Sequence, residues 1–125
     1  MKRILFIVFL FCAASCKKGE AVTIAPTITI NTPISNQHFV TGDTIRISGT
    51  ITSTIEMTEA SVHMTDNATK DEFYHNHYIP SNPTNLPYDF KYKITSSSKT
   101  TFQVEVGAGD KNGGIATKEI TISIN

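Results

Sequence analysis

Two histidines two positions apart are the residues of this sequence best suited to chemistry. They occur in Tyr74-His75-Asn76-His77-Tyr78. Alternation along a β-strand would place His75 and His77 on the same face, with backbones about 7 Å apart. Such a pair can chelate a metal ion, and imidazole nitrogens suit zinc and copper.

A third histidine, His63, precedes this pair by about one hairpin. If residues 66–71 close that hairpin, His63 falls roughly opposite His75 or its neighbour, and a shift of one residue in register decides whether it shares their face. Asp66 or Glu72 would then supply a further ligand. The sequence therefore offers His75, His77 and His63 as ligands for zinc or another divalent metal.

The alternative is that these histidines have no ligand. One face of the strand would then carry Phe73, His75, His77 and Ile79 as ordinary packing or hydrogen-bonding residues of a half-exposed sheet. On this interpretation the protein has no cofactor.

The segment Asp110-Lys111-Asn112-Gly113-Gly114 mixes oxygen-bearing side chains with glycines, as some calcium loops do. It is too short for an EF-hand loop and lacks the closing glutamate. We interpret it as a tight connection in which asparagine and glycine accept positive φ.

Four tyrosines raise the alternative of a glycan-binding module. Tyr74 and Tyr78 share one face of their strand, and Tyr88 and Tyr92 share one face of theirs. Exposed aromatic rings can stack on sugars. We expect Tyr88 and Tyr92 to lie in the core, because lysines occupy intervening positions of their strand.

Motifs that would indicate an enzyme do not occur in the sequence. There is no Gly-x-Ser-x-Gly elbow, no glycine-rich phosphate loop before a helix and no His-Glu-x-x-His helix. We therefore predict that the protein is not an enzyme and has no catalytic residues.

The elements that must position these side chains are β-strands. From Thr27 to the end, apolar and polar residues alternate, and no segment of useful length has helical period. The alternation predicts seven strands separated by turns, with a proline-rich connection over residues 80–87. The predicted strands span residues 27–31, 44–51, 60–65, 73–79, 88–94, 102–106 and 120–124. This number and spacing favour an all-β, immunoglobulin-like β-sandwich of antiparallel strands over a closed barrel.

A secretory leader opens the chain. Lys2 and Arg3 precede the apolar run Ile4–Phe11. This run is far shorter than the roughly 20 residues that cross a bilayer. We therefore expect a signal peptide rather than an integral membrane span.

The end of this leader, Ala13-Ala14-Ser15-Cys16, resembles the bacterial lipobox. The resemblance implies that Cys16 is diacylglycerated and that residues 1–15 are removed. Residues 16–26 would form a lipidated tether, and residues 27–125 a single domain. Two or three acyl chains would hold the protein on a membrane.

The charge of the mature chain excludes one class of partner. Loss of Lys2 and Arg3 leaves 9 of the 11 basic residues against all 11 acidic ones, a net charge of about −2. No basic face for nucleic acid is expected. With Cys12 removed and Cys16 acylated, the folded part has no cysteine for a disulfide or a metal.

The segment Phe102–Ile124 resembles the last two strands of bacterial Ig-like and cadherin-like domains, in which a strand ends in Ala-x-Asp, a Gly-Asn-type turn follows and the final strand pairs back. The opening Pro26-Thr-Ile-Thr-Ile and the Thr41-Gly-Asp-Thr-Ile run resemble uncharacterised Ig-like lipoprotein domains of Bacteroidota. The resemblance implies an outer-membrane lipoprotein of the cell envelope, on its periplasmic or surface face.

These observations favour a membrane-anchored, non-catalytic adhesion or accessory module that contacts a protein or glycan of the envelope. A small metal-binding lipoprotein using the histidines and a glycan-binding module stay open as alternatives. The oligomeric state is not predicted.

Overall fold

The computed structural model describes residues 23–81, 84–95 and 100–125. The predicted signal peptide, Cys16 and the first part of the tether lie outside these residues. The described chain forms eight strands: β1 (Thr27–Thr32), β2 (His38–Phe39), β3 (Thr44–Thr52), β4 (Met57–Asp66), β5 (Glu72–Tyr78), β6 (Asn85–Lys93), β7 (Thr100–Asp110) and β8 (Ile115–Ile124). This same part of the chain contains no helix that could cross a membrane.

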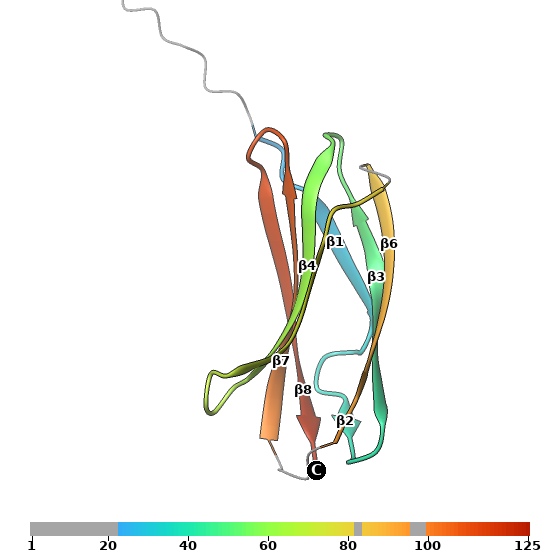
Figure 1. Cartoon of the computed structure of the whole chain (residues 1–125), viewed down its shortest axis with the longest axis vertical. Helices are drawn as coiled ribbons and strands as arrows, with labels where there is room; N and C mark the ends of the chain where they lie inside the picture. The colour runs from blue at the N-terminus through green and yellow to red at the C-terminus, as the bar shows by residue number, and fades with distance from the viewer. Residues whose placement is uncertain (1–22, 82–83, 96–99) are drawn as a thin grey trace, which may run out of the picture.

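The strands form two sheets that pack face to face (Figure 1). A three-stranded sheet has the order β1-β3-β6, and a five-stranded sheet the order β2-β8-β7-β4-β5. Neighbouring strands are antiparallel, apart from the short parallel pair of β2 and β8. The prediction of an all-β sandwich is confirmed.

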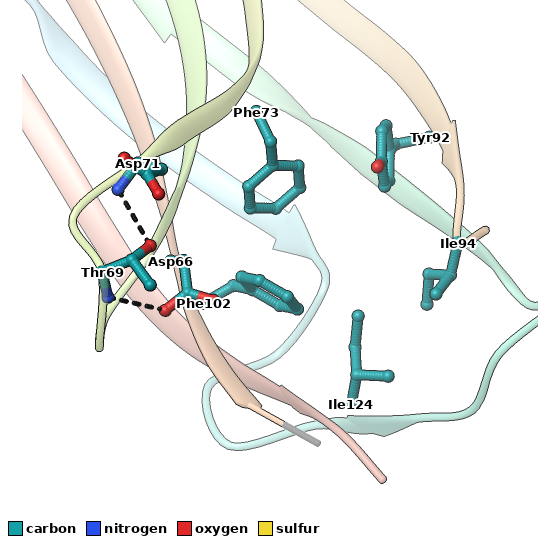
Figure 2. A pocket seen from close by; sticks show the side chains of 8 residues that line it. All are labelled: Asp66, Thr69, Asp71, Phe73, Tyr92, Ile94, Phe102 and Ile124. Carbon is teal, nitrogen blue, oxygen red and sulfur yellow. Dashed lines mark hydrogen bonds between the residues drawn. The ribbon is translucent and has the colours of Figure 1, made fainter. Parts of the chain in front are cut away.

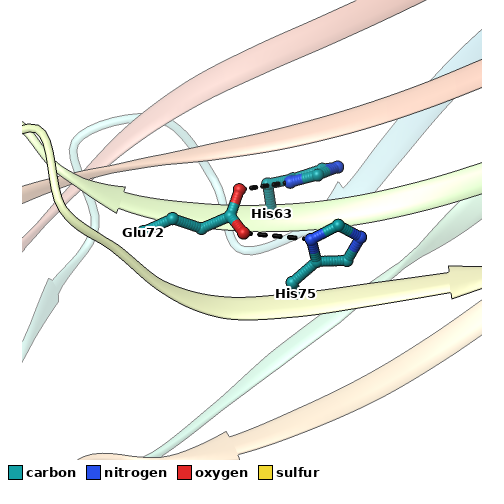
Figure 3. A group of neighbouring side chains, drawn as sticks. All are labelled: His63, Glu72 and His75. Atoms are coloured by element: carbon teal, nitrogen blue, oxygen red, sulfur yellow. Dashed lines mark hydrogen bonds and ion pairs between the residues drawn. The ribbon is translucent and has the colours of Figure 1, made fainter.

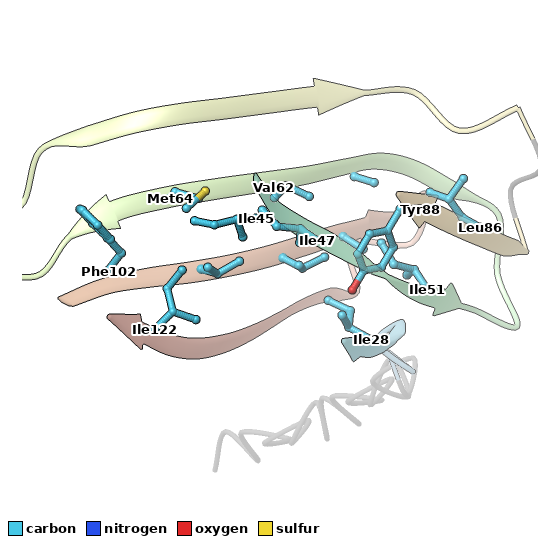
Figure 4. Close-up of a cluster of buried hydrophobic side chains, with 14 of the residues drawn as sticks. Ile28, Ile45, Ile47, Ile51, Val62, Met64, Leu86, Tyr88, Phe102 and Ile122 are labelled. Atoms are coloured by element: carbon cyan, nitrogen blue, oxygen red, sulfur yellow. The ribbon is translucent and has the colours of Figure 1, made fainter. Parts of the chain in front are cut away.

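The core lies between the sheets, where the apolar positions of the alternating strands meet (Figure 4). Fully burying one such aliphatic side chain contributes about 1.5–3 kcal/mol. The largest fully buried side chains are Ile94, which follows β6, and residues of β3, β4, β7 and β8: Ile45, Ile47, Ile51, Val62, Met64, Val104, Val106 and Ile122. Because these residues face inward, the residues between them on β4 and β7 face outward.

Several strand boundaries differ from the prediction, and β4 begins at Met57, three residues earlier than predicted. Strand β6 begins at Asn85, inside the expected connection 80–87, and Pro87 pairs with Thr50. Proline is tolerated there because β6 is an edge strand of its sheet. Strands β7 and β8 are longer than predicted, and β2 was missed because two residues are too few to show alternation.

The predicted turn between β7 and β8 is confirmed. Asp110 is buried, and its Oδ1 accepts hydrogen bonds from the backbone N–H groups of Asn112 at 2.8 Å and Gly114 at 2.9 Å. Gly113 has a φ of 83°, a conformation that glycine adopts readily, whereas the expectation of a positive φ at Asn112 is wrong.

A tyrosine crosses the three-stranded sheet where β3 carries a glycine. The Tyr88 hydroxyl donates to the Thr29 carbonyl at 2.7 Å, and Gly49 lies between these residues as the partner of Ile30 and of Tyr88. A Cβ atom at Gly49 would overlap both the Thr29 oxygen and the Tyr88 hydroxyl. Burial raises the pKa of Tyr88, so its hydroxyl keeps the proton that it donates.

We expect Gly49→Ala to lower the free energy of unfolding by about 2–4 kcal/mol, because the methyl group displaces the ring and a backbone carbonyl. Tyr88→Phe should cost only about 1 kcal/mol, since it removes one hydrogen bond and keeps the packing. Urea unfolding of both variants measures the difference. Equal losses would show that Gly49 is not a steric requirement.

Candidate metal site

One extra residue in β5 determines which side chains reach the outer face of the five-stranded sheet. Tyr74 pairs with Met64 and Glu72 pairs with Thr65, so Phe73 is left without a partner as a β-bulge. Regular alternation would place Glu72 on the face opposite His75. The bulge instead brings Glu72 to the same outer face and turns Phe73 toward the core.

On this outer face, Glu72 bridges two imidazoles (Figure 3). Its Oε2 lies 2.6 Å from Nδ1 of His63, and its Oε1 lies 3.0 Å from Nδ1 of His75. The two rings are cross-strand partners whose centroids are 4.2 Å apart. One ligand atom from each of the three residues lies within 4.8 Å of the other two.

The bridge determines which ring nitrogens are free. When each neutral imidazole donates its Nδ1–H to Glu72, its Nε2 carries an unshared electron pair. Figure 3 shows both Nε2 atoms on the side of the rings away from the carboxylate. A carboxylate that holds Nδ1 in this way fixes the tautomer and ring orientation that metal ligation through Nε2 requires. The hydrogen bond from His63, and then that from His75, lower the pKa of Glu72, which keeps it ionised.

His77, the second residue of the predicted pair, lies on the same outer face but outside the three-residue cluster. It pairs with Ser61, and its Nε2 lies 3.7 Å from Oε2 of Glu59. Since the backbones of His75 and His77 are about 7 Å apart along the strand, the imidazole of His77 lies beside the cluster and is not a member of it.

Two carboxylates continue the row that begins with the histidines. Glu105 of β7 pairs with His63 on one side and with Glu119 of β8 on the other. Partial burial raises the pKa of Glu105, and so do a hydrogen bond with Glu119 and the charge of that residue. The sequence analysis missed this row, because it joins four strands and becomes visible only once the register is known.

A groove of about 280 Å³ runs beside this row. Its lining includes His63, His75, His77 and Glu59. Gly107 supplies part of the floor, because the absence of a side chain leaves the outer face hollow between Ser61 and Thr117. The histidine nitrogens therefore face a space that solvent and ions can enter.

Several expectations about neighbouring residues are corrected. Phe73 does not share the face of His75 and His77, because the bulge turns it inward. Asp66 is not near the cluster; its Oδ1 accepts the backbone N–H groups of Ala68 and Thr69 and so caps the β4–β5 turn. Among the described residues, one group of histidine and carboxylate side chains could hold a metal ion, and it contains no residue of the 110–114 turn.

The tyrosines pack inward. Tyr88 is buried, and Tyr74, Tyr78 and Tyr92 pack against the core cluster. The exposed large apolar side chains of the described residues are all aliphatic: Ile24, Ile34, Val40, Ile79 and Ile115.

Comparison with known proteins identifies a fold but no family. No family model matches the chain, and no curated protein matches it. Among solved structures, a fibronectin(III)-like module structure of Clostridium thermocellum CbhA matches 79% of this chain with 16% identity and a TM-score of 0.51. This chain covers 46% of that one, which is less than half of its length.

Two further solved structures match the chain at low identity. A superoxide reductase (neelaredoxin) from Ignicoccus hospitalis matches 81% of this chain and 80% of its own, with 7% identity and a TM-score of 0.52. CopC from Methylosinus trichosporium OB3b matches 79% of this chain and 94% of its own, with 10% identity and a TM-score of 0.49. For the two structures with TM-scores above 0.5, the likeness at these identities concerns the fold alone, which is an immunoglobulin-like β-sandwich.

We expect Glu105→Gln to raise the free energy of unfolding at neutral pH by about 0.5 kcal/mol in metal-free protein, because it removes like-charge repulsion across the sheet. The raised pKa means that the folded state holds the Glu105 proton more firmly than the unfolded chain, so ionised Glu105 destabilises the fold as pH rises. The gain in the free energy of unfolding should disappear below pH 4.5, the ordinary pKa of a glutamate, because Glu105 is then protonated in both states.

Urea unfolding at neutral and acidic pH measures this effect. Glu56→Gln is the control, because Glu56 is exposed and pairs with Lys111 at 3.1 Å. It should give no gain. A Glu105→Gln protein no more stable than wild type at neutral pH would contradict the assignment of repulsion.

Proposed function

We propose that the protein is a non-catalytic binding module that holds one divalent transition-metal ion between His63 and His75. The observation that carries the proposal is the bridge from Glu72 to Nδ1 of both rings. This arrangement supports ligation through the two Nε2 atoms, with Glu72 as the orienting group. His77 borders the same groove and is the candidate for a third imidazole.

The residue types favour zinc or copper as the ion. Imidazole nitrogen suits both metals, whereas calcium and magnesium prefer a set of oxygen ligands. Two imidazole ligands leave coordination positions open to water or to His77, while Glu72 holds the rings from the Nδ1 side. The site is half-exposed, with side-chain exposures of 23% for His63 and 50% for His75, so an ion can enter without opening the fold.

Metal binding accounts for the geometry better than the two other functions considered from the sequence. An adhesion or accessory module requires only an exposed face and gives no reason for two imidazoles to share one carboxylate. A glycan-binding module was suggested by exposed tyrosines, but the described tyrosines pack inward.

We expect purified protein titrated with zinc or copper to bind one ion per chain, measured by calorimetry at neutral pH. His63→Ala combined with His75→Ala should abolish saturable binding, and Glu72→Gln should weaken it by about 10–100-fold. His38→Ala is the matched control, because His38 lies on β2 at the opposite edge of the sheet, bonded to Ser123.

Two results would contradict the proposed site. One is the absence of saturable binding by wild-type protein, and the other is unchanged binding by the double variant. His77→Ala tests the third imidazole separately: a loss smaller than that of the single His63→Ala variant would leave His77 outside the first coordination sphere.

We also propose that Cys16 carries a lipid that tethers the module to the bacterial envelope, as an outer-membrane lipoprotein. The support is the lipobox-like segment Ala13-Ala14-Ser15-Cys16 after the apolar run. Acyl chains stabilise membrane binding by about 0.8 kcal/mol per buried methylene. A tethered metal site would remain at the envelope.

We expect Cys16→Ser to move the protein from the membrane fraction to the soluble fraction of the producing bacterium, measured by detergent-phase partitioning and intact mass. Cys12→Ser is the matched control, because the other cysteine of the leader should not be acylated. A Cys16→Ser protein that keeps its acyl mass and stays in the membrane fraction would overturn this part of the proposal.

A further inference from the structure

A second cavity, of about 320 Å³, opens between the sheets beside the β4–β5 turn (Figure 2). Its walls are largely apolar, and its rim carries Asp66 and Asp71. Pockets of this size and lining are typical of small-molecule sites. The lining residues come from both sheets and from the turn: Asp66, Thr69, Asp71, Phe73, Tyr92, Ile94, Phe102 and Ile124.

Three aromatic rings form one side of this cavity. The centroid of Phe73 lies 5.4 Å from that of Tyr92 and 4.7 Å from that of Phe102, and the rings are tilted or edge-on to one another. Figure 2 shows the Phe73 and Tyr92 rings pointing into the space above Ile124. Tilted rings around one space present ring faces or edges to whatever occupies it.

Negative charge is held at the mouth of the same cavity. Asp66 accepts backbone N–H bonds from Ala68 and Thr69, and these two bonds are the main reason why its pKa lies below the ordinary range. It is therefore ionised at neutral pH. Asp71 is exposed, and among the described residues neither Asp66 nor Asp71 forms an ion pair, although Lys70 of the same turn adds a small electrostatic effect on Asp66.

Aromatic walls beside two carboxylates that form no ion pair among the described residues favour one class of ligand. The faces of aromatic rings attract cations, and this attraction increases when the cation is desolvated. A strongly hydrated inorganic ion would lose its water to enter an apolar space, whereas a quaternary ammonium group is apolar on its surface and charged at its centre. The carboxylates at the rim complement that charge.

We propose that this cavity is a binding site for a small free molecule carrying a quaternary ammonium group. The ammonium group lies against Phe73 and Tyr92, and Asp71 balances its charge at the rim. The site is independent of the proposed metal site, because Phe73 faces inward from β5 whereas His75 faces outward from the same strand.

The test is a titration of the purified full chain with choline and with its neutral isostere 3,3-dimethyl-1-butanol, measured by calorimetry and by tyrosine fluorescence. The chain has no tryptophan, so tyrosine dominates its emission and Tyr92 contributes to it directly. We expect saturable binding of choline and binding of the isostere weaker by about tenfold or more, since the two differ only in charge.

Two variants separate charge from shape. Asp71→Asn, at an exposed position, should weaken choline binding severalfold and leave the isostere unaffected, while Tyr92→Leu should weaken choline binding by about tenfold. Glu56→Gln is the matched control, because it removes a carboxylate that belongs to the Lys111 ion pair instead of this rim. The variant lacking His63 and His75 should bind choline normally.

Equal affinity for choline and the isostere would overturn the proposal, because the cavity would then select shape alone. Absence of choline binding, or unchanged choline binding in both Asp71→Asn and Tyr92→Leu, would overturn it as well. None of these results bears on the zinc and copper titrations, so failure of this site and failure of the metal site are distinguishable.

Discussion

The unpaired residue Phe73 is the constraint on which both candidate sites depend. A strand alternates strictly, so residues three apart normally face opposite sides of a sheet. One bulge reverses this relation for Glu72 and His75, and the carboxylate reaches both imidazoles. The same bulge turns Phe73 inward, where its ring forms part of the aromatic wall beside Tyr92. Bulges occur where a strand must redirect a side chain, and here one bulge redirects two.

The core explains why the outer face is free to carry this chemistry. Val62 and Met64 are fully buried, so β4 cannot slip by one residue without exposing both of them. His63, between them, is therefore held outward, directly opposite His75. The inward packing of apolar residues thus determines the alignment of the polar residues. No apolar side chain has to leave the core for His63 and His75 to meet on the outer face.

The sequence contains the alternation but not the register. Alternation along the chain was enough to predict the sandwich, the inward Tyr88 and Tyr92, and the common face of His75 and His77. It could not predict that Glu72 joins them, because a bulge is a departure from alternation and depends on the partner strand. The row from His63 to Glu105 and Glu119 was missed for a related reason, since its members are distant in sequence and are aligned only by hydrogen bonding between β4, β7 and β8.

The outer face of the five-stranded sheet has an electrostatic reason to bind a cation. Its outward positions carry four carboxylates, on Glu59, Glu72, Glu105 and Glu119. The one lysine within β4, β5, β7 and β8 is Lys118, which pairs with the buried Val106 and so lies on the other side by alternation. Like charges on adjacent strands destabilise a sheet unless a counter-charge is present. Because the imidazoles are neutral when they offer Nε2 to a metal, they cannot also supply that charge, whereas a divalent ion between them would. The four carboxylates repel one another weakly when no ion is bound. A divalent ion would reduce this repulsion, and its binding would therefore be favoured.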